Sequence, residues 1–255
     1  MFPERLVLPE GFRVESPDDS SGVVLDGAVA RHLVQVLRIR KGQSLRLGDG
    51  LGRTRMALVS DVQRRALSLE WSTEVERVER PSPEIVLALA MIEASDLRRA
   101  VEGAVEAGVD RVVLFRAHHS NRALPAIGDA LWEKLVKIIR LSCEQSKRAW
   151  VPELELCTDV PGFLQSSAQI VVAHGGFRLQ SLVEICSGWD SDRGPMVVAV
   201  GPEGGWGPEE LKGFESADLP LGHLGESVLR ARTAAPVVVN HLQLVRTRLN
   251  ARASS

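Results

Sequence analysis

From residue 85 onwards, the chain repeats short and uniformly apolar runs that alternate with longer stretches of helical periodicity. Each apolar run predicts a strand that is buried on both faces, because a strand with one face in water would alternate apolar and polar residues. The runs are residues 85–91, 112–115, 170–173, 196–200 and 219–224. Strands that alternate with helices are typical of a parallel sheet, so this part of the chain is predicted to be an α/β domain.

Helical stripes lie between and after these strands, at residues 97–105 and 131–143. A last helix is expected to begin near Thr233, which would cap it, with Pro236 in its first turn. Apolar residues cover much of the circumference of this last helix, which predicts burial on several sides. They are Val237, Val238, Val239, Leu242, Leu244, Val245 and Leu249.

Residues 1–78 have a different pattern, in which short apolar runs are separated by glycines. This pattern predicts a small β-barrel, with one helix at residues 27–37. Pro81 and Pro83 then favour an extended linker, because proline cannot continue the interior of a strand. The sequence therefore predicts two domains, residues 1–78 and 79–255.

The composition excludes several classes of protein. Of the 255 residues, 44% are hydrophobic and 25% are charged, as in a soluble globular protein. No apolar run reaches the roughly 18 residues that cross a bilayer, and the first ten residues do not read as a signal peptide. The three cysteines have no close pair, which argues against a disulfide framework or a zinc site. We therefore expect a cytoplasmic protein with no membrane span and no metal.

Positive charge is concentrated in the predicted barrel. Residues 31–65 contain nine basic and two acidic residues, which gives +7 within a chain whose net charge is −2. Such segregation is expected of a surface that binds phosphate groups, although an ordinary solvated face is the alternative. The basic residues are Arg31, Arg38, Arg40, Lys41, Arg46, Arg53, Arg55, Arg64 and Arg65.

A glycine-rich loop, residues 201–207, follows one of the buried strands. Its spacing matches neither the dinucleotide-binding fingerprint nor the P-loop. Pro202 removes a backbone N–H and Glu203 adds an anion, so the loop is poorly suited to phosphate. A ligand that carries positive charge and an adenine edge fits better; a simple tight turn is the alternative reading.

A second loop, residues 224–232, also joins a strand to a helix and carries Arg230 and Arg232. These arginines either clamp an anionic group or are solvated. His174 stands at another strand end, where a capping role is favoured over a role in catalysis. In open α/β sheets, ligands bind beyond the carboxyl ends of the strands, so these loops mark the candidate site.

The same loops resemble those of a known family. Residues 201–205 (GPEGG), 224–225 (LG) and 228–230 (VLR) look like the cofactor loops of the SPOUT methyltransferases. More narrowly, they resemble the bacterial enzymes that methylate N3 of a uridine in 16S ribosomal RNA. Residues 32–38, 106–109, 143–153 and His174 agree with further motifs of that family, in the right order along nearly the whole chain.

The resemblance implies a PUA-like RNA-binding barrel before a SPOUT domain that contains a trefoil knot, forms a homodimer and binds S-adenosylmethionine. The implied cofactor-binding residues are Val172, His174, Gly201, Pro202, Glu203, Gly204, Gly205, Leu224, Gly225, Val228, Leu229, Arg230 and Thr233. The expected contacts to ribosomal RNA, or to the small ribosomal subunit, are Arg31, His32, Arg38, Arg40, Lys41, Arg53, Arg55 and Arg148.

Three positions depart from the family pattern. Ser227 stands at a family arginine, Arg232 at a family glutamate and Gly103 at a family lysine. Methylation at uracil N3 requires removal of a weakly acidic proton. Arg230 is expected to stabilise the resulting anion, and Glu203 or Glu226 to accept the proton. The departures leave two alternatives: a SPOUT enzyme for another RNA position, and an RNA-binding dimer without turnover.

Overall fold

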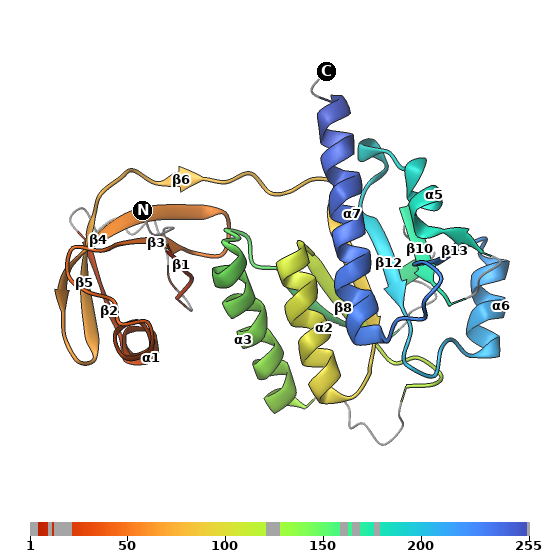
Figure 1. Ribbon diagram of the computed structural model, residues 1–255, viewed down its shortest axis with the longest axis horizontal. Helices are drawn as coiled ribbons and strands as arrows, with labels where there is room; N and C mark the ends of the chain where they lie inside the picture. The colour runs from red at the N-terminus through yellow and green to blue at the C-terminus, as the bar shows by residue number, and fades with distance from the viewer. Residues whose placement is uncertain are drawn as a thin grey trace. The chain divides into compact units, whose positions relative to one another are not determined.

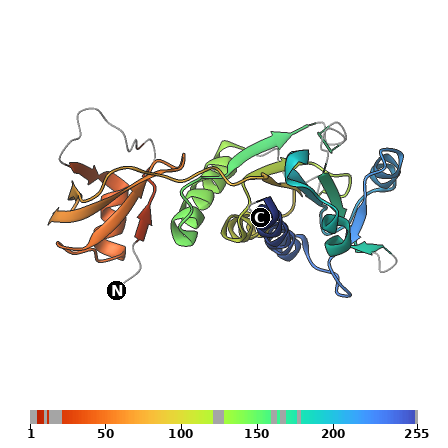
Figure 2. The ribbon, with the colours of Figure 1, turned by 90° about the horizontal axis from the view of Figure 1, so that it is seen from above.

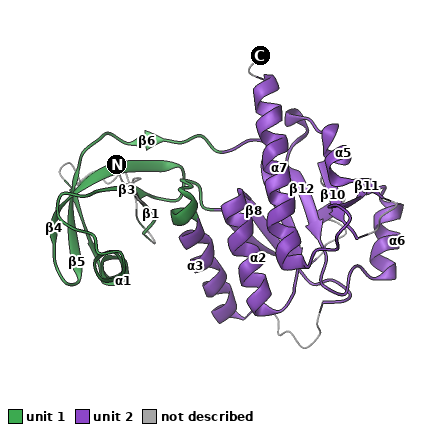
Figure 3. Cartoon of the chain, in the orientation of Figure 1, with its two compact units in different colours: residues 1–80, 143–151 green, residues 81–142, 152–255 purple. Residues whose placement is uncertain are grey.

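The computed structural model describes residues 5–9, 12, 22–120, 128–158, 163–164, 169–175 and 179–253. The chain divides into two compact units, shown in different colours in Figure 3. Unit 1 contains residues 1–80 and 143–151, and unit 2 contains residues 81–142 and 152–255. Within the described ranges, no helix has the length and apolarity that crossing a membrane requires.

The described part of unit 1 is a six-stranded sheet in the order β1-β3-β4-β5-β2, with β6 paired to β4. Its strands are β1 (Arg5–Val7), β2 (Gly22–Asp26), β3 (Ser44–Gly48), β4 (Arg53–Val62), β5 (Ala66–Trp71) and β6 (Glu76–Arg77). Alternate residues of β3 and β5 are buried, among them Leu45, Leu47, Leu67 and Leu69. This period of two places one face of each strand in the core, so the predicted small β-domain is confirmed.

The helix predicted at residues 27–37 forms as two continuous segments, α1 (Gly27–Arg31) and the π-helical turn η1 (His32–Val36). Ala30 and Leu33 are its buried residues. The three-residue spacing places both side chains on the same face of the helix, where Leu33 joins the core of unit 1.

A segment distant in sequence completes unit 1. Trp150 pairs with Leu51 in a β-bridge, and its indole Nε1 donates a hydrogen bond to the Val78 carbonyl at 2.9 Å. Gly52 permits this approach, because a Cβ there would lie 2.5 Å from the Trp150 ring. Nearby, the Leu8 backbone N–H donates to Glu144 Oε1 at 2.8 Å. Residues 143–151 therefore belong with the N-terminal sheet.

Unit 2 contains a seven-stranded sheet whose strand pairs are all parallel, in the order β11-β13-β10-β12-β7-β8-β9. The strands are β7 (Ile85–Ala90), β8 (Arg111–Phe115), β9 (Glu153–Cys157), β10 (Gln169–Ala173), β11 (Gln180–Ser181), β12 (Met196–Val200) and β13 (Leu221–His223). The predicted α/β domain with a parallel sheet is confirmed. Strands β9 and β11 were not expected, because neither is a compact apolar run.

Helices cover both faces of this sheet (Figures 1 and 2). Helix α2 (Ala94–Ala107) packs beside α7 (Ala231–Ala253), and α7 lies against β7 and β12. On the other face, Phe214 of α6 (Pro208–Ser216) joins Val86, Val113 and Val197 in one apolar cluster. Other helices in the described ranges include α3 (Asp129–Ser146), α5 (Leu182–Ser187) and the 3-10 turn η2 (Ser191–Arg193).

The start of α7 differs from the expectation. The helix begins at Ala231, and the backbone N–H groups of Thr233 and Ala234 both donate to the Arg230 carbonyl at 2.8 Å. Thr233 is therefore inside the helix rather than its cap, and Pro236 lies beyond the first turn. Pro236 packs beside α2 at Gly103, where a Cβ would lie 3.1 Å from the proline ring. The trefoil knot stays a prediction from the resemblance.

Candidate functional site

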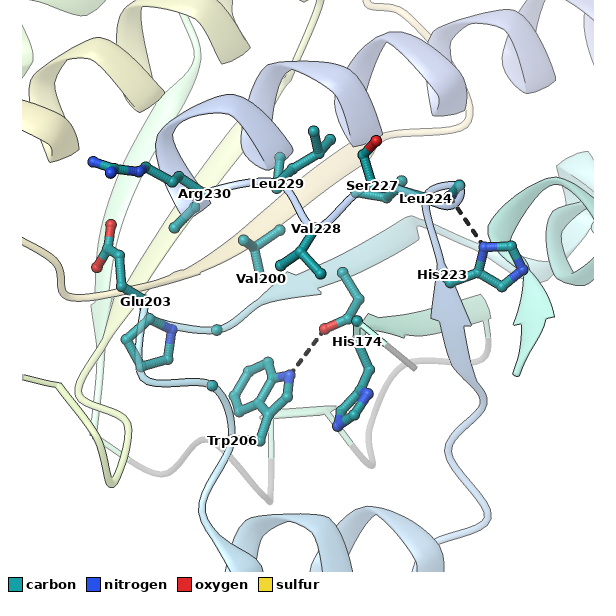
Figure 4. A pocket seen from close by; sticks show the side chains of 18 of the residues that line it. His174, Val200, Glu203, Trp206, His223, Leu224, Ser227, Val228, Leu229 and Arg230 are labelled. Atoms are coloured by element: carbon teal, nitrogen blue, oxygen red, sulfur yellow. Dashed lines mark hydrogen bonds between the residues drawn. The ribbon is translucent and has the colours of Figure 1, made fainter. Parts of the chain in front are cut away.

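A pocket of about 700 Å³ opens in unit 2 where β10, β12 and β13 end (Figure 4). Three loops form its walls: residues 173–175 after β10, residues 200–206 after β12, and residues 223–231 between β13 and α7. Because neighbouring strands of the sheet are parallel, their carboxyl ends meet at one edge and bring these loops together. The volume lies within the roughly 300–1,000 Å³ of pockets that hold small organic molecules.

Most of the residues predicted for the site line this pocket. They are His174, Gly201, Pro202, Glu203, Gly204, Gly205, Leu224, Gly225, Glu226, Val228, Leu229 and Arg230. Two predicted cofactor residues do not line it. Val172 is buried within β10, and Thr233 is exposed on α7.

Trp206 is a lining residue that the sequence analysis missed. Its indole stacks on Phe115 with ring centroids 5.9 Å apart, and it meets Phe214 edge-on at 4.9 Å. Its Nε1 donates a hydrogen bond to the Ala173 carbonyl at 2.9 Å, which ties the loop after β12 to the loop after β10. Gly201 packs closely beside it, because a Cβ there would lie 3.0 Å from the ring. These partners are distant in sequence, so no local pattern marks this role.

The loop after β13 presents bare backbone to the pocket at Gly225. This glycine has φ +129°, which L side chains rarely adopt, and a Cβ there would meet no atom within 4 Å. Its N–H donates to His223 Nδ1 at 3.0 Å, which fixes the turn. Any side chain at this position would therefore strain the backbone and project into open space.

Two oppositely charged side chains lie at one end of the pocket. Figure 4 shows the side chains of Arg230 and Glu203 at the same end, one from each of the two opposing loops. Both side chains are exposed, as is Glu226. Arg230 is held by its backbone, since its carbonyl accepts the first hydrogen bonds of α7. A cation and carboxylates thus border one accessible space.

Much of the remaining pocket wall is apolar. Val200, Leu224, Val228, Leu229 and Ala234 supply apolar side chains to the lining. Gly175 lies close to Val228, because a Cβ at Gly175 would be 3.7 Å from the valine side chain. Apolar walls with bare backbone between them suit a flat heteroaromatic ring such as adenine, whose edge requires backbone donors and acceptors. Among the described residues, no cluster of three potential metal ligands occurs.

The three departures from the family pattern have different surroundings. Arg232 does not line the pocket; its Nη1 lies 2.8 Å from Asp96 Oδ1 on α2. Ser227 is exposed at the pocket, and Gly103 lies against Pro236. The structure thus explains Arg232 by an ion pair and Gly103 by close helix packing.

The residues predicted to contact RNA all lie in unit 1. Arg31, His32, Arg38, Arg40 and Lys41 are exposed along the α1–η1 segment and the turn after it. The other three predicted residues are only partly exposed. Arg53 lies 3.7 Å from Asp49, Arg55 stacks over Trp71 at 4.6 Å, and Arg148 is half-buried.

Two family models match this chain, one in each part of the sequence. Residues 79–243 match the family model described as an RNA methyltransferase domain, and residues 25–82 match an RNA methyltransferase PUA domain. The chain is 32% identical to ribosomal RNA small subunit methyltransferase E of Mycobacterium bovis over 253 residues, which covers 93% of this chain and 92% of the relative. A protein of the same name from Mycobacterium tuberculosis matches equally well.

Solved structures show the same fold. The crystal structure of a ribosomal RNA small subunit methyltransferase E from Neisseria gonorrhoeae, bound to S-adenosyl methionine, superposes with a TM-score of 0.77. It is 23% identical in sequence, and the match covers 95% of this chain and 98% of that one.

Proposed function

The chain belongs to the RNA methyltransferase family, and we propose that it transfers a methyl group from S-adenosylmethionine to N3 of a uridine in small-subunit ribosomal RNA. The observation that carries this proposal is the pocket at the carboxyl edge of the parallel sheet. It combines the glycine loop, the loop that carries Arg230, and apolar walls in one space of about 700 Å³.

The residues present fit this cofactor. Val200, Leu224 and Leu229 would flank the adenine ring, and the backbone of residues 201–205 would bond its edge. S-adenosylmethionine, when bound, supplies an electrophilic methyl group on a positively charged sulfonium. Glu203, an anion at the rim, favours a ligand with that charge over a phosphate.

The chain's own groups would handle the proton and the charge of the uracil. Removal of the N3 proton leaves negative charge on the ring and its two exocyclic oxygens. The guanidinium of Arg230 would stabilise that charge, and a carboxylate oxygen of Glu203 or Glu226 would accept the proton. The N3–H bond would thus be replaced by an N3–CH₃ bond, while the S–CH₃ bond of the sulfonium is broken and S-adenosylhomocysteine is the second product.

Methyl transfer from isotope-labelled S-adenosylmethionine to small-subunit RNA tests the proposal. We expect label at one uridine, at N3, identified by nuclease mapping and mass spectrometry. Label on another base would show that the enzyme methylates a different RNA position. RNA binding without any label, on naked RNA and on small subunits alike, would favour a non-catalytic RNA-binding dimer.

Unit 1 is the proposed RNA-binding part. Its exposed cations at Arg38, Arg40 and Lys41 follow one another along the chain and would contact phosphates. Replacing all three by alanine should weaken RNA binding and reduce the slope of log affinity against log salt by up to about one per lost contact. Unchanged affinity and slope would show that these residues form only a solvated face.

We also propose that the protein acts as a homodimer through α5 and α7. Val183, Val237 and Leu244 are 59%, 42% and 62% exposed. They line a groove of about 290 Å³ on unit 2. Leu242, which the sequence pattern placed among the candidates for this surface, is fully buried within its own unit.

Light scattering of a Leu244→Asp variant tests the dimer. The variant should have half the mass of the wild-type protein, because a charge in an apolar interface is costly to desolvate. Val24→Asp, a similarly exposed position in unit 1, is the matched control and should keep the wild-type mass. Equal masses for Leu244→Asp and wild type would contradict this interface.

A cytoplasmic location completes the proposal. The ribosomal RNA substrate of the relatives supports it, and the three cysteines, Cys143, Cys157 and Cys186, are free thiols, as a reducing compartment would keep them.

A further inference from the structure

A short turn follows strand β8 and lies behind the glycine loop of the pocket. The turn is closed at both ends: the Ala117 N–H donates to Ser120 Oγ and the Ser120 N–H donates to the Ala117 carbonyl, each at 3.0 Å. Ala117 and Ser120 are both buried. These contacts fix the turn, and with it the two histidines between them, His118 and His119.

The two histidines both contact the glycine loop. Successive residues of a strand would point to opposite sides, but in this turn the two rings touch each other, with centroids 4.8 Å apart. A Cβ at Gly204 would lie 2.9 Å from His119 Cβ, and a Cβ at Gly207 would lie 2.8 Å from His118 Cβ. Glycine is therefore needed at 204 and 207, because the histidines occupy the space behind the loop.

Hydrogen bonds strengthen this contact. His119 Nδ1 lies 3.2 Å from the Gly205 carbonyl oxygen. Because a carbonyl only accepts, the ring nitrogen must be the donor. Glu210 joins the two segments a second time, since its carboxylate accepts from the Gly207 N–H at 2.7 Å and from the His118 N–H at 3.1 Å.

We propose that His119 is a positioning residue for the cofactor loop, an inference that rests on the proposed function. His119 does not line the pocket, whereas Gly204 and Gly205 do. Gly205 has φ +73°, and its N–H donates a hydrogen bond to the Pro202 carbonyl within the loop at 2.9 Å, so the bond from His119 is the contact that joins this residue to another segment. A loop rich in glycine loses much conformational entropy on ordering. The hydrogen bond from His119 holds Gly205 in place before the ligand binds. Less conformational entropy is then lost on binding, and this raises the affinity for the ligand.

Calorimetric titration with S-adenosylhomocysteine tests the inference in three proteins: wild type, His119→Ala and His119→Asn. Alanine keeps the Cβ that packs against Gly204 but removes the donor. Asparagine keeps a side-chain N–H near the position of Nδ1. We expect His119→Ala to bind about 3- to 10-fold more weakly, the usual effect of one lost hydrogen bond, and His119→Asn to bind within about twofold of wild type.

Thermal unfolding of the same proteins separates positioning from folding. Because His119 is exposed, both variants should keep the wild-type melting temperature within about 2 °C. The inference is overturned if His119→Ala binds as tightly as wild type, or if the asparagine variant loses as much affinity as the alanine variant. Absence of binding by wild-type protein would overturn the proposed function and this inference with it.

Discussion

The guanidinium of Arg246 on α7 donates a hydrogen bond to the carboxylate of Asp110, and both side chains are nearly inaccessible to water. Asp110 also accepts from the Ile85 N–H at 3.0 Å, where β7 begins. Arg246 bonds in addition to the Pro83 carbonyl at 3.2 Å and to Gln243 Oε1 at 2.6 Å. One buried ion pair thus connects the first strand of the parallel sheet to its last helix.

Removing one partner of this pair should destabilise the protein strongly. Arg246→Met would leave the Asp110 carboxylate buried without its cation, which costs about 3–5 kcal/mol of unfolding free energy. Urea denaturation followed by circular dichroism measures it. Arg252→Met, at an exposed position of the same helix, should change stability by less than about 0.5 kcal/mol. Similar midpoints for the two variants would contradict the role of the pair.

The ion pair between Arg232 and Asp96 predicts that the family's glutamate would be unfavourable at position 232 of this chain. Arg232→Glu recreates the family residue but places a carboxylate beside Asp96. Repulsion should then disturb the first turn of α7, which begins directly after Arg230, and weaken S-adenosylhomocysteine binding about 3- to 10-fold. The double variant Asp96→Lys/Arg232→Glu should recover most of the loss. Failure of the second substitution to rescue binding would show that the pair does not support the loop.

Two glycines of the pocket should resist substitution for different reasons. Gly204→Ala would place a methyl group 2.9 Å from His119 Cβ, and Gly225→Ala would strain a backbone at φ +129°. Each variant should bind S-adenosylhomocysteine about 5- to 150-fold more weakly by calorimetry, because strain of about 1–3 kcal/mol is relieved by moving the loop. Gly213→Ala, where an added Cβ meets nothing within 4 Å, should bind like wild type. Wild-type affinity in both pocket variants would place the cofactor elsewhere.

His241 predicts how stability depends on pH. Burial, and secondarily the charge of Arg248, lowers the pKa of His241 below its ordinary value of 6.5. The unfolded chain therefore takes up this proton more readily than the folded one, so the contribution of His241 is present above pH 6.5 and is lost as pH falls through the folded-state pKa. The melting temperature of wild type should drop more steeply from pH 7 to pH 5 than that of His241→Gln. Parallel curves would contradict this assignment.

Local patterns in the sequence determined the classes of structure and most of the pocket. The uniformly apolar runs at β7, β10 and β12 predicted a parallel sheet, because burial on both faces leaves no polar alternation. The glycine-bearing loops that follow β12 and β13 could be identified as a site because parallel strands end at one edge. In both cases each run or loop is recognised from consecutive residues, without knowledge of what packs against it.

Only the tertiary structure decided which distant side chains meet. The docking of Trp150 on Gly52, the stacking of Trp206 on Phe115 and the pairing of Arg232 with Asp96 each join segments far apart in the chain. The exposure of Leu244 and the burial of Leu242 likewise depend on what packs against α7. A single sequence shows the periodicity within a helix or strand. A contact between two elements forms only when the chain between them folds back and brings them together. No local sequence pattern identifies the two residues that then meet.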